Sequence, residues 1–283
     1  MKIAFWSNEY EKSCAYLNFA AVSIAGVMSH TYTITVLENY LDRNNLGKAF
    51  FAYNDSIHAK YEGTGFYEGG GIEGLLRRIY RGDIYPSLLR GYLKEVIPNH
   101  LYYIPQSGII NCELFDYEMY NNINELLYII EKNSDVCYIN TIQQNHLSSK
   151  AILQEADIIV INLYQNSDYL EEFFKNYYSL IPKSVFIVGN YSPKSIMSCR
   201  RISRTYNIPM EDISAIPYNE YFNVACSYGG AKEFLNSHYF SPKESPHYPF
   251  IRGVRRTAYM MSKKVEEIHN SRKEEMEHCS ILP

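Results

Sequence analysis

The sequence lacks the features of secreted, membrane-spanning and metal-binding chains. Its six cysteines are scattered, without the closely spaced Cys or Cys/His pairs of a zinc site and without the pattern of a disulfide framework. No apolar run of about 18 residues occurs, and the apolar run at the amino end is too short for a secretory signal peptide. We therefore expect reduced thiols, no metal site and a cytoplasmic protein.

An excess of charge of one sign is also missing. Lysine and arginine total 27 against 31 aspartates and glutamates, which gives a formal net charge of −4. Such a chain has no overall attraction to polyanions, so we expect no direct nucleic-acid partner. Hydrophobic residues make up 46% and charged residues 20%, a balance that excludes a disordered chain. What is abundant is tyrosine, with 28 residues, whose rings suit half-buried positions.

Short apolar runs alternate with longer amphipathic stretches, as in parallel sheets buried under helices. The predicted strands are 2–7, 31–37, 101–105, 135–140, 157–163, 184–189 and 213–217, and the predicted helices are 14–28, 71–81, 86–96, 117–132, 147–155, 167–179, 193–206 and 250–278. This order predicts an α/β fold, a largely parallel twisted sheet with helices on both faces. Functional loops should lie at the carboxyl ends of the strands. We predict one domain over residues 1–249, with residues 250–283 as a C-terminal helix that packs on it or extends from it.

The turn after the first predicted strand, residues 7–18, contains no glycine. Anion-binding loops use glycine because their converging backbone amides require positive φ. Glu9 and Glu11 would place negative charge beside a phosphate, and Lys12 compensates only in part. Ser13 is predicted to cap the helix that begins at residue 14. The turn therefore predicts a structural role rather than phosphate binding.

Several segments in order resemble the MinD/ParA group of deviant Walker-A ATPases. They are 2–7, 38–46, 71–77, 156–166, 188–192 and 216–219. The later segments are most similar to the TadZ/CpaE-like pilus-assembly relatives of that group. The resemblance covers roughly residues 1–260 and implies the three-layer P-loop NTPase fold and a homodimer. It also implies protein partners in a Tad-type pilus or secretion machine, with recruitment to the inner face of the membrane through such partners.

Carried over residue by residue, the resemblance implies a degenerate phosphate loop. Tyr10 stands in place of the signature lysine and Ala15 in place of the Walker lysine. Tyr16 stands in place of the hydroxyl that would bind magnesium. Lys12 and Cys14 occupy other positions of the same loop.

The switch positions are degenerate as well. Glu38 keeps a carboxylate at the first position of the switch I pair, but Tyr40 replaces the second aspartate. Asn140 replaces the aspartate that ends the switch II strand, which removes a charge near the metal. These losses predict a pseudo-ATPase with no catalytic residue and no cofactor, whose pocket is filled by tyrosines and whose dimer needs no nucleotide.

Three alternatives remain open at this stage. Asn190, Pro217 and Tyr218 occupy adenine-side positions of the family, although asparagine and proline are also ordinary turn formers. A weak ATPase could bind ATP and magnesium through Lys12 and Glu38. DNA binding would rest on the basic start of the last helix.

Overall fold

The structure is a computed structural model that describes all residues except 30–31, 41–45, 53–69, 107–110, 142–145 and 281–283. Its centre is an eight-stranded sheet in the order β3-β4-β2-β5-β1-β6-β7-β8. The strands are β1 (Lys2–Ser7), β2 (Ile34–Glu38), β3 (Lys94–Ile97), β4 (Leu101–Tyr103), β5 (Val136–Asn140), β6 (Ile158–Leu163), β7 (Ser184–Val188) and β8 (Ile213–Ala215). Among the strands described, neighbours are parallel except for the antiparallel pair of β3 and β4.

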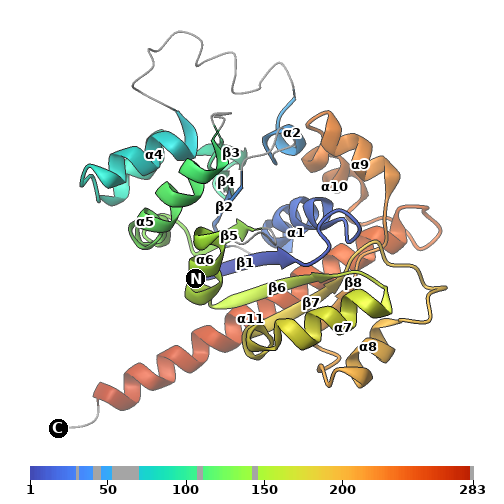
Figure 1. The fold of residues 1–283 in the computed structure, drawn as a ribbon. Helices are drawn as coiled ribbons and strands as arrows, with labels where there is room; N and C mark the ends of the chain where they lie inside the picture. Colours follow the sequence, from blue (N-terminus) through green and yellow to red (C-terminus); the bar gives the residue numbers. More distant parts are fainter. Residues whose placement is uncertain (30–31, 41–45, 53–69, 107–110, 142–145, 281–283) are drawn as a thin grey trace.

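Helices cover both faces of the sheet (Figure 1). One face carries α1 (Ala15–Ser29), α2 (Leu46–Phe50), α9 (Glu220–Ser227), α10 (Ala231–His238) and α11 (Tyr248–Ser280). The other carries α4 (Gly71–Tyr80), α5 (Cys112–Glu131), α6 (Leu147–Glu155), α7 (Ser167–Asn176) and α8 (Cys199–Thr205), with the 3-10 helices η2 (Pro86–Gly91) and η3 (Tyr178–Lys183). Alternate residues of β1 enter the two cores, Phe5 on the first face and Trp6 on the second. The predicted three-layer α/β fold is confirmed.

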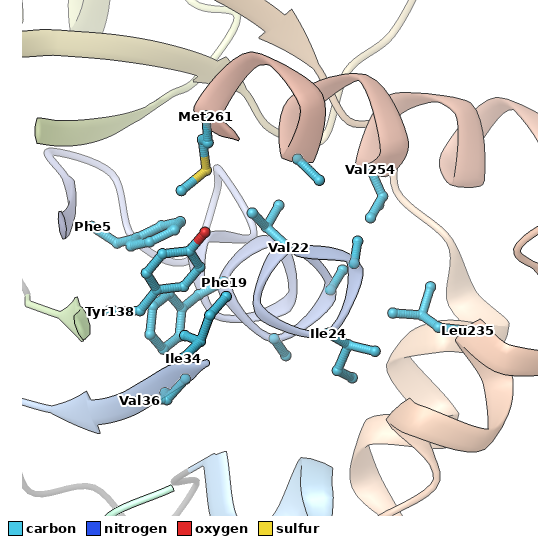
Figure 2. Close-up of a cluster of buried hydrophobic side chains, with 14 of the residues drawn as sticks. Phe5, Phe19, Val22, Ile24, Ile34, Val36, Tyr138, Leu235, Val254 and Met261 are labelled. Carbon is cyan, nitrogen blue, oxygen red and sulfur yellow. The ribbon is translucent and has the colours of Figure 1, made fainter. Parts of the chain in front are cut away.

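Helix α1 is enclosed, which fixes the loop that precedes it. Figure 2 shows Phe19 of α1 beside Phe5 of β1, and the two rings meet edge to face with centroids 4.6 Å apart. Val22 and Ile24 are also fully buried, on a helix covered by the sheet, α10 and α11. A helix that is apolar around its circumference belongs in a core, so the position of its amino end, where the loop from β1 enters, is set by packing on the sheet, α10 and α11.

The predicted helix 86–96 is wrong. Residues Pro86–Gly91 form the 3-10 helix η2, and Lys94–Ile97 form β3 at the edge of the sheet. Proline starts the short helix, while Val96 is buried and Glu95 exposed in the period-two alternation of an edge strand. Two predicted helices are shorter than expected: 167–179 ends as a helix at Asn176, and 193–206 starts only at Cys199. Helices α2, α9 and α10 were not predicted.

Helix α11 runs behind the sheet from the β8 edge and continues beyond it (Figure 1). Val254, Ala258 and Met261 enter the first core. Farther along, Arg272 forms an ion pair with Asp157. The predicted division of the chain after residue 249 stays a prediction. Within the described residues, no helix combines the length and apolar character needed to cross a membrane.

Candidate functional site

The loop between β1 and α1 is folded onto itself. Three of its backbone amides donate to carbonyls of the same loop: Ser13 to Glu9 (2.9 Å), Cys14 to Glu11 (3.1 Å) and Ala15 to Tyr10 (3.1 Å). Cys14 has φ 53°, in the left-handed region that favours glycine. The absence of glycine therefore does not keep positive φ out of this loop, contrary to expectation. The backbone turns tightly, but these three amides are already satisfied within it.

Ser13 does not cap the helix, so that prediction is wrong. Helix α1 begins at Ala15, and the Ser13 hydroxyl instead lies 2.9 Å from the Ser7 hydroxyl and donates to the Tyr10 carbonyl (3.3 Å). Both serines are fully buried. The side chain therefore ties the loop to the end of β1.

Residues of α1, β6 and the turn after β7 hold this loop in place. The Asn18 amide donates to the Ser13 carbonyl (3.0 Å) and to the Asn162 side-chain oxygen (3.1 Å). Gly189, which follows β7, lies so close that a Cβ there would stand 1.8 Å from the Ser13 carbonyl oxygen. Only glycine can stand this close to the Ser13 carbonyl, so the turn after β7 packs directly against the loop.

Tyr10, Tyr40 and Asn140 meet at the carboxyl ends of β1, β2 and β5. The Asn140 side-chain amide donates to the Tyr10 hydroxyl (3.1 Å) and to the Tyr40 hydroxyl (2.9 Å). The two phenol oxygens are also hydrogen-bonded to each other, and the rings meet edge to face with centroids 5.8 Å apart. Tyr40 and Asn140 are buried and Tyr10 is half-buried. We call these three residues the tyrosine cluster.

Glu38 is a buried carboxylate whose oxygens accept several hydrogen bonds. The backbone amide of Leu46 lies 3.1 and 3.0 Å from its two oxygens, and the Tyr103 hydroxyl donates to Oε2 (2.8 Å). Burial, and then the nearby Glu38 charge, hold the pKa values of Tyr40 and Tyr103 well above the usual phenol range. The phenol of Tyr16 interacts electrostatically with both. At neutral pH the phenols of Tyr40 and Tyr103 are uncharged hydrogen-bonding groups.

Lys12 lies on the other side of β1 from the tyrosine cluster. Its ammonium group donates to the Tyr169 hydroxyl of α7, stands 4.4 Å from the centre of that ring and lies 3.6 Å from Glu9. The hydrogen bond to Tyr169 raises its pKa above the usual value. Helix α7 follows β6, whereas Tyr40 follows β2 and Asn140 ends β5, and β1 lies between these two sides of the sheet. The structure therefore does not bring Lys12 and Glu38 together.

Solved structures of MinD and ParA proteins share this architecture. A ParA family ATPase from Chlorobium tepidum is 13% identical, with a TM-score of 0.66 over 91% of this chain and 98% of that chain. The chain has the MinD/ParA-type fold. A chain of the MinC:MinD cell division protein complex from Aquifex aeolicus is 11% identical, with a TM-score of 0.65 over 93% of this chain and 96% of that chain. MinD from Pyrococcus horikoshii, complexed with Mg-ADP, is 14% identical, with a TM-score of 0.59 over 91% and 95% of the two chains.

Identity at this level establishes the MinD/ParA-type fold alone. No protein-family profile matches the sequence, and no curated protein matches it either.

The predicted base-side residues lie on neighbouring strand ends of the MinD/ParA-type fold. The Tyr191 amide donates to the Ile216 carbonyl (3.1 Å), which holds Asn190 beside Pro217. Asn190 is exposed and has φ 47°, the left-handed conformation of a turn. Tyr218 is 46% exposed and accepts from the Asn223 side chain (3.1 Å). Turn formation accounts for Asn190, and a base-binding role stays a prediction.

Sequence reasoning missed the polar residues around the cluster. Tyr103 holds Glu38, and the Gln106 side chain donates to the Tyr40 carbonyl. Buried Asn39 donates to Ser148 (3.0 Å) and Ser149 (3.1 Å) of α6. Gln106 could have been suspected, because it directly follows the predicted strand 101–105, whereas Tyr103 lies in the middle of that predicted strand and ends the observed β4. Within the described residues, no three His, Cys, Asp or Glu side chains group closely enough to hold a metal ion.

Proposed function

We propose that this protein is a catalytically inactive ATPase-like scaffold that positions or assembles other proteins, in a Tad-type pilus or secretion machine. The main support for the proposed inactivity is the hydrogen bonding within the β1–α1 loop. Its amides at Ser13, Cys14 and Ala15 donate to the loop's own carbonyls. Anion cradles depend on amides of this kind being directed at the ligand, and here carbonyl oxygens take that place.

The tyrosine cluster supports the same proposal. Its phenols and the Asn140 amide bond to one another at the strand ends where the family's switch residues would act. Neutral phenols supply neither the positive charge that a triphosphate requires nor the charged oxygens that magnesium prefers. Tyr10, Tyr16 and Tyr40 would thus fill the pocket in place of a ligand.

The residues present do not fit ATP with magnesium. Tyr16 provides a bulky phenol at the family's metal-hydroxyl position, and Asn140 is uncharged. Glu38 is buried, and its oxygens accept from Leu46 and Tyr103. We therefore propose that the protein does not hydrolyse ATP. The weak-ATPase alternative requires Lys12 and Glu38 to act together, and their separation argues against it.

The scaffold part of the proposal rests on the segment resemblance to TadZ/CpaE-like relatives and on the MinD/ParA-type fold. We propose a homodimer that forms without nucleotide, because the groups that would respond to a γ-phosphate are replaced. Light scattering of the purified protein, with and without ATP and magnesium, tests this: the same dimer mass is expected in both.

Calorimetric titration with ATP and magnesium tests the inactivity directly. We expect no binding at ligand concentrations up to about 1 mM, a range in which family-type nucleotide sites would be saturated. Micromolar binding would overturn the proposal. ATP turnover that disappears in Lys12→Ala but persists in Lys263→Ala, a matched exposed lysine, would favour the ATPase alternative instead.

A further inference from the structure

Five exposed arginines flank the outer edge of the sheet at β8, a region that the proposed function does not use. They are Arg200, Arg201 and Arg204 of α8 and Arg252 and Arg256 of α11. We infer that this arginine face is the docking site for an acidic segment of a partner protein, one in which carboxylates alternate with apolar side chains.

Helices α8 and α11 both pack on β8, the edge strand, from opposite faces of the sheet. Gly253 of α11 lies against the strand, since a Cβ there would stand 2.4 Å from the Ala215 carbonyl oxygen. The Thr257 hydroxyl donates to the Ser214 hydroxyl (2.9 Å). Arg256 acts electrostatically on Cys199, the first residue of α8. The arginines of the two helices therefore flank the same edge of the sheet, one group on each side of β8.

Within each helix the arginines lie on the same side. Arg200 and Arg204 are four residues apart, and so are Arg252 and Arg256, a spacing that stacks like charges on one helix face. Such pairs oppose folding slightly, and an acidic side chain nearby would relieve the repulsion. In the part of the chain that the structure describes, none of the five arginines forms an ion pair.

The two acidic residues that directly precede β8 are paired with lysines. Glu211 lies 4.0 Å from Lys263, and Asp212 lies 3.5 Å from Lys264. Both acids precede β8, toward the end of the strand away from Gly253. The arginine face thus keeps a local positive charge on a chain whose net charge is −4.

The chemistry of the face favours a protein over nucleic acid or lipid. Ile196, in the turn before α8, is 75% exposed, and Tyr259, next along the α11 stripe, is 65% exposed. Arginine and aromatic side chains are enriched at protein interfaces. The guanidinium fork also binds carboxylates with two parallel hydrogen bonds. The negative net charge of the whole chain opposes long-range attraction to a polyanion.

The test uses the full chain and a short fluorescent peptide in which glutamate alternates with leucine and tyrosine. Anisotropy titrations compare wild type with Arg200→Gln/Arg256→Gln and with the matched control Arg81→Gln/Arg90→Gln, whose arginines are exposed on the opposite half of the sheet. We expect the first variant to bind at least about tenfold more weakly, and the control to match wild type. Wild-type binding should weaken when salt rises to about 0.5 M.

Three results would overturn the inference: no peptide binding by wild type, equal binding by both variants, or tighter arginine-dependent binding of a DNA duplex or of phosphatidylglycerol vesicles. Circular dichroism of each variant checks that the helices are intact. The outcome is independent of the ATP titration, because β8 lies three strands away from β1.

Discussion

Replacing Tyr40 with phenylalanine tests whether the tyrosine cluster holds the strand ends together. The substitution removes one hydroxyl and leaves the ring. The Asn140 amide then loses the acceptor at 2.9 Å, and Tyr10 loses its phenol partner. Because Asn140 is 1% exposed, water cannot readily replace the lost oxygen.

A buried donor left without an acceptor costs about 1–3 kcal/mol of unfolding free energy. Each kcal/mol corresponds to a shift in melting temperature of about 2–4 °C for domains of about 150–250 residues. We therefore expect Tyr40→Phe to melt several degrees below wild type at neutral pH. Tyr80→Phe is the control, because Tyr80 is 78% exposed and its hydroxyl is free to bond water.

The pH dependence gives a second readout. Burial raises the pKa of Tyr40 well above 10.0, so the fold favours the neutral phenol. This contribution is complete below the unfolded-state pKa near 10 and is lost as pH rises toward the folded-state pKa. The unfolding free energy of wild type should fall as pH rises above about 10. That of Tyr40→Phe should fall by up to about 1.4 kcal/mol less per pH unit.

Urea unfolding monitored by circular dichroism, from neutral pH to about pH 11, measures both effects. If Tyr40→Phe matches Tyr80→Phe in stability at neutral pH and in its slope at alkaline pH, the cluster does not stabilise the fold and the reasoning fails.

Three further predictions follow from close packing, from thiol burial and from the buried carboxylate. Gly189→Ala should lower the unfolding free energy by about 3 kcal/mol or more, because a Cβ would overlap the Ser13 carbonyl; Gly91→Ala, with open space around it, should be nearly neutral in a parallel urea titration. Among the described cysteines, exposed Cys112 should react first with a thiol reagent in peptide mapping at pH 8, and Cys137, whose pKa burial raises to about 12, should stay unmodified. Glu38→Gln keeps one acceptor oxygen and should cost about 1–3 kcal/mol, and an equal melting temperature would show that Leu46 and Tyr103 find other partners.

The core of the fold was predictable because its strands are buried on both faces. The runs that became β1 and β6 are largely apolar, with polar residues only at Lys2, Ser7 and Asn162. Their alternation with predicted helices indicated a parallel sheet. Edge and connecting elements were not predictable in the same way. Strand β3 has four residues and follows Pro86–Gly91, and together these resemble one amphipathic helix in sequence.

The site was predictable in position and not in detail. Parallel strands end at a common edge, so residues that follow β1, β2 and β5 had to lie near one another, as Tyr10, Tyr40 and Asn140 do. The self-closure of the loop depends on which carbonyls its amides reach, and no residue pattern reports that. The Ser13 prediction failed for this reason, since capping statistics assume a free helix start.

Under the proposed inactivity, the self-closed loop implies that restoring one side chain would not create a phosphate site. A lysine at position 15 would return a cation, yet the amides of Ser13, Cys14 and Ala15 would still face oxygen atoms of the same sign as an incoming phosphate. The turn at Gly189 packs against the Ser13 carbonyl and leaves the loop no space to shift in that direction. On this proposal, a variant that binds nucleotide here would need a different main-chain path between Ser7 and Ala15, which requires several substitutions at once.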